Sequence, residues 1–224
     1  MEKSYYRYNQ LQLIFNIIRK LPIQSILDLG CGEGFLEEAF PDKKIVAVDI
    51  DKEALKKAKK RASWAYYLNT DIRNLSLVEK FDLVILIAVL GSIESKEEDA
   101  FLEKISQFLK PGGFLLIFVT QDIFPYSIFS PIRLKRKKWR FFKAKDLINK
   151  LEKNGFYLYL IRYFGGPLTL LFNLIYLALN KILKLFNLKI SYKIFSWLES
   201  PEFIHPRPSW LSHFICFVFQ KKYD

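Results

Sequence analysis

SILDLGCGEGF, Ser25–Phe35, is a short apolar run that closes on an acid, Asp28, and opens into three glycines on alternate positions. The run predicts a buried strand, and Gly30, Gly32 and Gly34 let a ligand lie against bare backbone N–H groups. The alternative is an ordinary strand-to-helix turn, because alternate glycines alone are a weak signal and one glycine often serves only to admit a positive φ. The stretch favours a nucleotide-binding loop, and the rest of the chain decides between these two interpretations.

Outward from this loop, apolar runs alternate with helix-like segments. The expected strands follow Ser25–Leu29 at 44–50, 65–69, 81–90, 113–120, 156–164 and 213–222. The expected helices lie at 11–21, 33–40, 52–62, 96–109 and 143–154. Continuous apolar runs are typical of strands buried on both faces, so the alternation predicts an α/β fold with a doubly wound, mostly parallel sheet. Ligands bind such sheets outside the carboxyl ends of the strands.

Size and composition indicate one domain. The 224 residues are 51% hydrophobic and 26% charged, as in globular proteins, and the aromatic share of 17% is high. Cys31 and Cys216 lack the spacing of a metal or disulfide site, and no metal is expected. The first residues, MEKSYYRYNQ, lack the apolar core of a secretory signal, so we expect a cytoplasmic protein.

The formal net charge of +12 favours an anionic partner. Nucleic acid, an acidic membrane surface and a phosphorylated substrate all fit this charge, and so does a lysine-rich surface with no partner. The position of the basic residues is more informative than their number.

Two further acids follow the next two expected strands. Asp49 ends the second strand, where a carboxylate can accept hydrogen bonds from both hydroxyls of a ribose. Asp71 follows the third strand, where it could accept from an exocyclic amine, with Ile50 and Ile72 on the faces of a flat ring. Alternatively, Asp49 could cap the helix near residue 52, and Asp71 could shape an Asx turn. Acids at the ends of three successive strands favour a nucleoside site over separate caps.

These stretches together resemble the class I S-adenosylmethionine-dependent methyltransferases. ILDLGCGEG matches the acid-x-Gly-x-Gly-x-Gly loop of that family, VAVDID its second-strand acid, and NTDIRNL its adenine-side acid. FDLVILIAVLGSI and LKPGGFLLIF match its fourth and fifth strands. Dinucleotide loops usually read Gly-x-Gly-x-x-Gly, which makes a dehydrogenase a poorer match. The resemblance covers residues 21–164 and, beyond them, a final strand.

The resemblance implies a seven-stranded Rossmann-like sheet whose antiparallel last strand forms a hairpin with the sixth, and S-adenosyl-L-methionine as cofactor. It assigns Asp28 and the glycine loop to the methionine end, Asp49 to the ribose, and Asp71 to the adenine amine. The implied cofactor-binding residues are Asp28, Gly30, Cys31, Gly32, Asp49, Ile50, Asp71, Ile72 and Ile87. The chain departs from the family at AVLGSI (88–93), where many members carry an acid in place of Ala88 and a histidine in place of Ser92.

The catalytic residues are not identified by the sequence. Methyl transfer from a sulfonium depends mainly on alignment, so a general base matters only for a weakly acidic acceptor such as a phenol. Asp122, after the fifth strand, and His205, in the loop PEFIHPRPSW, are the candidates. His213 falls in a strand and is expected to be structural.

Two segments bear on the acceptor. RLKRKKWR, Arg133–Arg140, has six basic residues of eight and could grip phosphates, or be a solvated charge run pressed onto an apolar surface by its aromatic neighbours. Pro167–Ile190 predicts a helix with a narrow polar stripe and a wide apolar face, interrupted by Asn180, Lys181 and Lys184 before it could span a bilayer. This helix could lie in a membrane interface, cover an acceptor pocket, pair two protomers or pack in the core.

The sequence therefore predicts one methyltransferase domain over 1–224, with a helical cap at 1–21 and an apolar helical insertion at 165–211. The expected function is methyl transfer to a small apolar or lipid-like acceptor, at a membrane surface. A nucleic-acid methyltransferase or RNA-binding protein is the alternative favoured by the charge, and a non-catalytic protein of the same fold is the third. The acceptor atom, the oligomeric state and the use of a base are not determined by the sequence.

Overall fold

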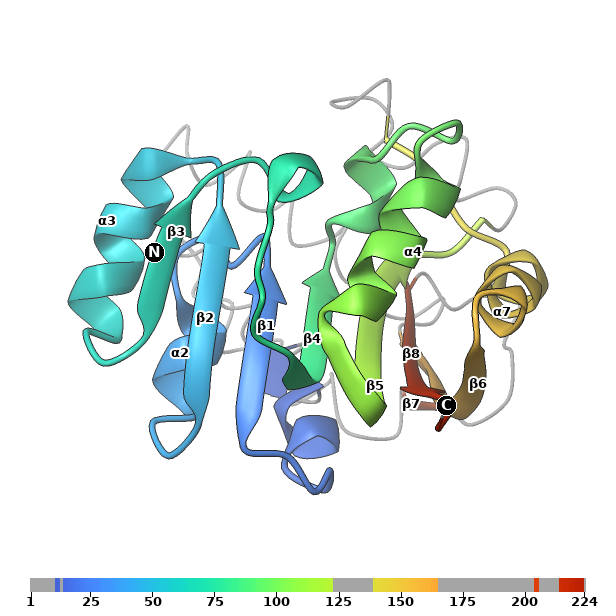
Figure 1. Ribbon diagram of the computed structural model, residues 1–224, viewed down its shortest axis with the longest axis horizontal. Coiled ribbons are helices and arrows are strands. Elements are labelled where there is room, and N and C mark those ends of the chain that lie inside the picture. The colour runs from blue at the N-terminus through green and yellow to red at the C-terminus, as the bar shows by residue number, and fades with distance from the viewer. Residues whose placement is uncertain (1–10, 13, 123–138, 165–203, 206–213, 224) are drawn as a thin grey trace, which may run out of the picture.

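The computed structural model describes residues 11–12, 14–122, 139–164, 204–205 and 214–223, and its centre is a twisted sheet (Figure 1). The strands are β1 Ser25–Leu29, β2 Lys44–Asp49, β3 Tyr66–Asn69, β4 Phe81–Ile87, β5 Leu109–Thr120, β6 Phe156–Phe164, β7 Ile204–His205 and β8 Phe214–Lys221. The helices are α2 Phe35–Ala39, α3 Lys52–Arg61, α4 Glu98–Gln107 and α7 Ala144–Lys153, with 3₁₀ turns η1 Ile72–Asn74 and η2 Leu90–Ser92. Residues 11–12 and 14–18 are also helical.

The strand order is β3-β2-β1-β4-β5-β8-β6-β7. The first five strands in this order are parallel, and β8 is antiparallel to both of its neighbours, β5 and β6. This confirms the predicted seven strands and the antiparallel last strand. The sheet has one addition, the two-residue β7, which pairs with the end of β6. The sequence placed His205 in a loop, and that prediction is wrong because its backbone joins the sheet edge.

Alternation along the strands divides the core into two layers. Val84 and Leu86 of β4 belong to the cluster covered by α4 and α7, whereas Leu83 and Ile85 belong to the cluster covered by the helix at 14–18 and by α2. Each strand is therefore apolar on both faces, which explains the continuous apolar runs in the sequence. The result is a three-layer α/β/α arrangement, with α4 across the front of the sheet in Figure 1.

The predicted helices at 52–62, 96–109 and 143–154 are confirmed as α3, α4 and α7, and α2 is shorter than the predicted 33–40. The predicted helix over 167–190 and nearly all of the insertion at 165–211 lie outside the described residues. No helix in the described ranges is long and apolar enough to cross a membrane.

Asp82 ties three strands together at their amino ends. Its Oδ2 accepts from the amides of Gln24 and Ser25 and from the Ser25 hydroxyl, at 2.8–3.0 Å. Its Oδ1 accepts from Lys110 Nζ of β5 at 2.7 Å. Partial burial alone would raise the pKa of Asp82, but the hydrogen bonds from Lys110, Gln24 and Ser25 outweigh it and lower the pKa to about 2. One carboxylate thus fixes the register of β1, β4 and β5 at the edge away from the glycine loop.

Replacing the Asp82 carboxylate tests how much these hydrogen bonds stabilise the fold. We expect Asp82→Asn to lower the free energy of unfolding by about 2 kcal/mol at neutral pH, because hydrogen bonds to a charged group are lost. The folded pKa is depressed, so the contribution of Asp82 is complete above the unfolded pKa, near 4, and fades as the pH falls through about 2. Urea titrations at several pH values from neutral to about pH 3 should show that the difference in free energy of unfolding between wild type and variant becomes smaller as the pH falls.

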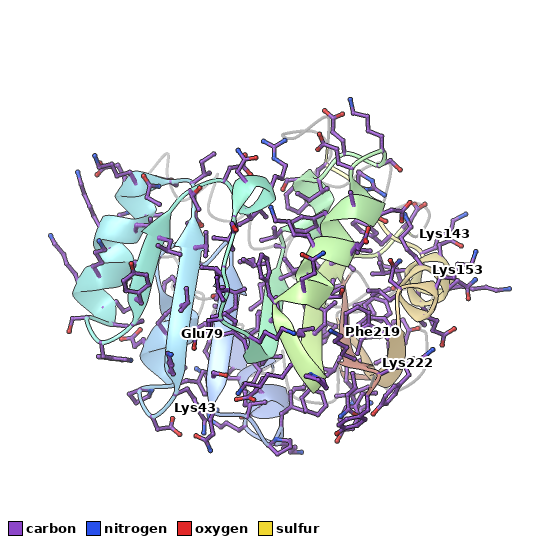
Figure 2. The ribbon with its side chains drawn as sticks, in the orientation of Figure 1. Lys43, Glu79, Lys143, Lys153, Phe219 and Lys222 are labelled. Carbon is purple, nitrogen blue, oxygen red and sulfur yellow. The ribbon has the colours of Figure 1, made fainter. Side chains whose placement is uncertain are left out.

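Glu79→Gln is the matched control at the same edge (Figure 2), since Glu79 pairs with Lys44 and both side chains are exposed. It should change stability by less than about 1 kcal/mol. If the difference in free energy of unfolding between wild type and Asp82→Asn stays constant down to pH 3, the charged Asp82 carboxylate does not stabilise the fold as described.

Candidate functional site

The glycine loop joins β1 to α2 at the carboxyl edge of the sheet. Gly30, Gly32 and Gly34 all have a positive φ, at 88°, 57° and 80°. A Cβ on Gly34 would lie 2.7 Å from Ala58 Cα, so Gly34 lets α2 pack directly on α3. A Cβ on Gly32 would meet none of the described residues within 4 Å. The loop is therefore packed against α3 at Gly34, whereas the space beside Gly32 is open.

Asp49 holds this loop from the neighbouring strand. Its Oδ2 accepts from the Gly32 amide and its Oδ1 from the Asp51 amide, each at 2.8 Å. The cap of α3 is Asp51, which accepts from the amides of Glu53 and Ala54, so Asp49 is not the helix cap. Asp49 is only half-buried, and a carboxylate has about four acceptor positions, so it can bind further donors beside Gly32.

Asp71, which the sequence predicted to accept from an adenine amine, accepts hydrogen bonds from Arg73 in the structure. It caps η1 by accepting from the Arg73 amide, and its two oxygens also accept from Arg73 Nε and Nη2 at 2.6–3.1 Å. These hydrogen bonds lower the pKa of Asp71. The Asx-type turn that the sequence allowed is therefore present, and Arg73 is a partner that sequence reasoning missed. Of the two predicted ring-packing residues, Ile50 is 69% exposed, whereas Ile72 packs partly against the core.

The end of β4 lies beside the loop. Asp28 of β1 pairs with Ile85, so Ile87 extends beyond it at the same edge. A Cβ on Gly30 would lie 2.3 Å from Val89 Cγ2, so the chain after β4 packs directly on the loop. Between them Ala88 has φ 56°, a left-handed conformation that costs about 1–2 kcal/mol in a residue with a Cβ. Such strain is typical of functional edges, and it occurs where the family's acid is missing.

Asp28 itself is almost enclosed. It is 3% exposed, its carboxyl group contacts that of Glu37 in α2, and burial is the main cause that raises its pKa. Glu37 was missed by the sequence analysis. Its only signal was an acid beside Leu36, on the apolar stripe of a short helix.

The returning end of the basic segment docks beside β4 and β5. Trp139 and Arg140 are the only residues of 133–140 that the structure describes. The Arg140 amide donates to Gly91 O at 2.9 Å, and Trp139 Nε1 donates to Thr120 Oγ1 at 3.4 Å. Gly91 is required here, because a Cβ would lie 2.6 Å from the Trp139 ring. The aromatic residue of the segment thus contacts the sheet edge next to the loop.

Arg140 serves an internal ion pair. Its guanidinium pairs with Glu98, which is 3% exposed and also binds Lys150 at 2.7 Å. It also donates to Ile93 O at 3.2 Å and lies over the Phe142 ring. The basic segment therefore gives its last cation to a buried carboxylate and not to an external phosphate.

The candidate catalytic residues lie at different distances from the end of β4. Asp122 is exposed just after β5, next to β4, and its amide donates to Phe142 O at 2.9 Å. The backbone of His205 pairs with Tyr163 at the carboxyl end of β6, four strands from β4. At about 4.8 Å per strand, that is roughly 19 Å along the sheet. His213 lies outside the described residues, and no cluster of metal-ligating side chains occurs among those described.

Comparisons with known proteins agree with this geometry. Residues 26–113 match the family model described as a methyltransferase domain. The mitochondrial ubiquinone biosynthesis O-methyltransferase of Dictyostelium discoideum is 26% identical over 165 residues, which cover 60% of this chain and 51% of the relative. A malonyl-[acyl-carrier protein] O-methyltransferase of Anoxybacillus flavithermus is 40% identical over 70 residues, 29% of this chain and 27% of the relative. The chain thus spans about half or less of the length of these curated relatives.

Solved structures share the whole fold at low identity. N-methyltransferase NodS of Bradyrhizobium japonicum in complex with S-adenosylhomocysteine superposes with a TM-score of 0.62 at 18% identity, covering 96% of this chain and 86% of that one. A methyltransferase of Archaeoglobus fulgidus gives 0.67 at 16% identity, covering 96% and 94%. The fold is that of S-adenosylmethionine-dependent methyltransferases, as the motifs predicted, and residues 26–113 are similar to a methyltransferase domain.

Proposed function

We propose that this protein is an S-adenosylmethionine-dependent methyltransferase that transfers a methyl group by direct displacement to a small acceptor. The observation that carries the proposal is the open space in front of Gly32, next to the hydrogen-bonding carboxylate of Asp49, at the carboxyl edge of the sheet. The matched methyltransferase domain and the methyltransferases of known reaction among its relatives support it.

The residues present suit the cofactor. Asp49 would accept from the ribose hydroxyls with the positions that Gly32 and Asp51 leave free, and the exposed Ile50 would cover a face of the adenine. Asp71, held in place by Arg73, would share one oxygen with the adenine amine. S-adenosylmethionine supplies an activated methyl group on its sulfonium. The protein supplies alignment of the acceptor with that methyl group and exclusion of water.

We infer further that the acceptor is apolar or lipid-like and is met at a membrane surface. The apolar face predicted over 167–190 and the basic residues of 133–138, which the structure does not describe, support this inference. Trp139 against the sheet edge would give the acceptor side an aromatic wall. Because Arg140 is bound to the buried Glu98, the described end of the basic segment lends less support to a nucleic-acid acceptor. Asp122 is the candidate base for an acceptor that needs one.

Calorimetry tests the cofactor assignment. The wild type should bind S-adenosylhomocysteine, and Asp49→Ala should weaken binding by about a hundredfold, because two hydrogen bonds to a charged group are lost. Asp42→Ala removes an exposed aspartate paired with Lys43 before β2, at the opposite edge, and should leave affinity unchanged. Equal affinity for wild type and Asp49→Ala, or no binding at all, would refute the proposed site.

Alanine substitutions at two glycines distinguish the effect of backbone strain from the effect of filling the space for the ligand. Gly32 and Gly155 both have a positive φ, and in the described part of the chain a Cβ on either meets nothing within 4 Å, but Gly155 lies in the turn between α7 and β6. Gly32→Ala and Gly155→Ala should each lower the free energy of unfolding by about 1 kcal/mol. Only Gly32→Ala should weaken S-adenosylhomocysteine binding, by about tenfold or more, because its methyl group fills the ligand space. Similar affinities for the two variants would show that this space is not the binding site.

Flotation with liposomes tests the membrane part. The wild type should float with vesicles that contain anionic lipid, and Leu171→Asp with Ile175→Asp should abolish flotation, because charges on the apolar face oppose its burial. At about 100° per residue, the polar stripe predicted on this helix consists of Thr169, Asn173, Asn180, Lys184 and Asn187. Asn173→Asp with Asn180→Asp makes the same charge change on that stripe and should retain most of the binding. Failure of the wild type to float would overturn the membrane inference and leave methyl transfer standing.

A further inference from the structure

Glu37 is a buried acid with no hydrogen-bond donor among the described residues. It lies in α2, is 0% exposed, and neither carboxyl oxygen has a hydrogen-bond partner among the described residues. The next residue, Glu38, is in contrast exposed and paired with Arg61 of α3 at 2.8 Å. An isolated buried carboxylate costs several kcal/mol, so Glu37 needs a compensating arrangement.

That arrangement is a contact with a second buried carboxyl group. Asp28, 3% exposed at the end of β1, lies close enough to Glu37 for the two carboxyl groups to affect each other's pKa. Two carboxylate ions have no proton to share, so this contact is a hydrogen bond only when one of the two groups is protonated. Because both carboxyl groups are buried and Glu37 has no donor among the described residues, the arrangement favours one proton on the pair.

The other titratable groups around the pair, among the described residues, do not neutralise it. They are Asp49 at the end of β2, Cys31 in the glycine loop and Tyr67 in β3, all of which are neutral or negative. Arg61 is occupied by Glu38 and by the carbonyl of Glu33. Burial and the charge of Glu37 both raise the pKa of Asp28, and burial raises that of Glu37 to about 7. The pair thus retains a proton close to neutral pH, as expected for two coupled acids.

We propose that Asp28 and Glu37 hold one proton in the free protein and exchange it for the ammonium group of the cofactor when that group reaches Asp28. The exchange conserves charge: the ammonium adds one positive charge to the site, and the proton leaves to solvent. The ammonium then donates to the Asp28 carboxylate, and no covalent bond other than the acid O–H changes. Glu37 is a positioning residue, because it acts only by setting the proton on Asp28. The proposal rests on the proposed function.

Proton release on binding is the direct measurement. Calorimetry of S-adenosylhomocysteine in two buffers of different ionisation enthalpy, near pH 6, should show close to one proton released per site. At pH values below the pKa of the pair, affinity should increase by up to about tenfold for each unit by which the pH is raised, because binding releases one proton. 5′-Methylthioadenosine, which lacks the amino-acid end, should bind with no proton release. Release of no proton with S-adenosylhomocysteine, or equal release with both ligands, would overturn the proposal.

Glu37→Gln should remove the effect. The glutamine amide can donate to Asp28, which stabilises its charged form without a shared proton, so proton release should vanish and the affinity should become nearly independent of pH. Glu38→Gln, the adjacent residue on the same helix, should behave like the wild type. A purely structural role for Glu37 would change stability and leave the pH profile of binding intact, which would contradict the proposal.

The free protein gives a test that does not depend on any cofactor. A raised carboxyl pKa means that the folded state binds more protons than the unfolded state between the unfolded pKa, near 4.5, and the folded value of about 7. The contribution of the pair to stability should therefore fall as the pH rises through this window, and Glu37→Gln should abolish that fall whereas Glu38→Gln keeps it. If no nucleoside ligand binds, the proposed function fails. The pair itself is refuted only if the wild type and Glu37→Gln respond alike to pH.

Discussion

Parallel pairing of β1 between β2 and β4 is the constraint on which the site depends. The register sets Asp28 of β1 opposite Ala47 of β2 and Ile85 of β4, so three strand ends share one edge. In Figure 1 the arrows of these strands all point upward. The glycine loop, Asp49 and the strained Ala88 are neighbours for this reason only. Burial of both sheet faces makes the register hard to change, because a slip by one residue would exchange the two halves of the core.

The carboxylates at the two edges of the sheet are stabilised in different ways. At the amino edge Asp82 has four donors, one of which is the cation Lys110, and at the start of α4 Glu98 pairs with Arg140 and Lys150. Each of these acids is neutralised by the protein itself. At the carboxyl edge the described residues give Asp28 and Glu37 no cation at all. The chain has a large excess of basic residues, so this lack is a local property of the site and not a shortage of positive charge.

Much of the fold could be predicted because its determinants are local in the sequence. The apolar runs identified every strand except β7, whose two residues are too few to form a pattern. The glycine loop and Asp49 were recognisable from spacing. The pairs Asp71–Arg73 and Arg140–Glu98 were not, because a charged residue gives no sign of its partner until the chain is folded. Glu37 was missed for a stronger reason: apart from its place beside Leu36, an acid in an EE pair that looks exposed gives no indication that it is buried.

The enclosure of Glu37 follows from the same close packing that forms the loop. Gly34 allows α2 to approach the Ala58 backbone, and Arg61 lies over the Phe35 ring at 4.0 Å, so the short helix is fixed between the loop and α3. Glu37 cannot turn to solvent without moving that helix. Its carboxyl group must therefore be stabilised inside, by a proton or by a cation brought from outside. A site with this property distinguishes ligands by charge, since a neutral nucleoside leaves the proton in place and a nucleoside with an ammonium group can displace it.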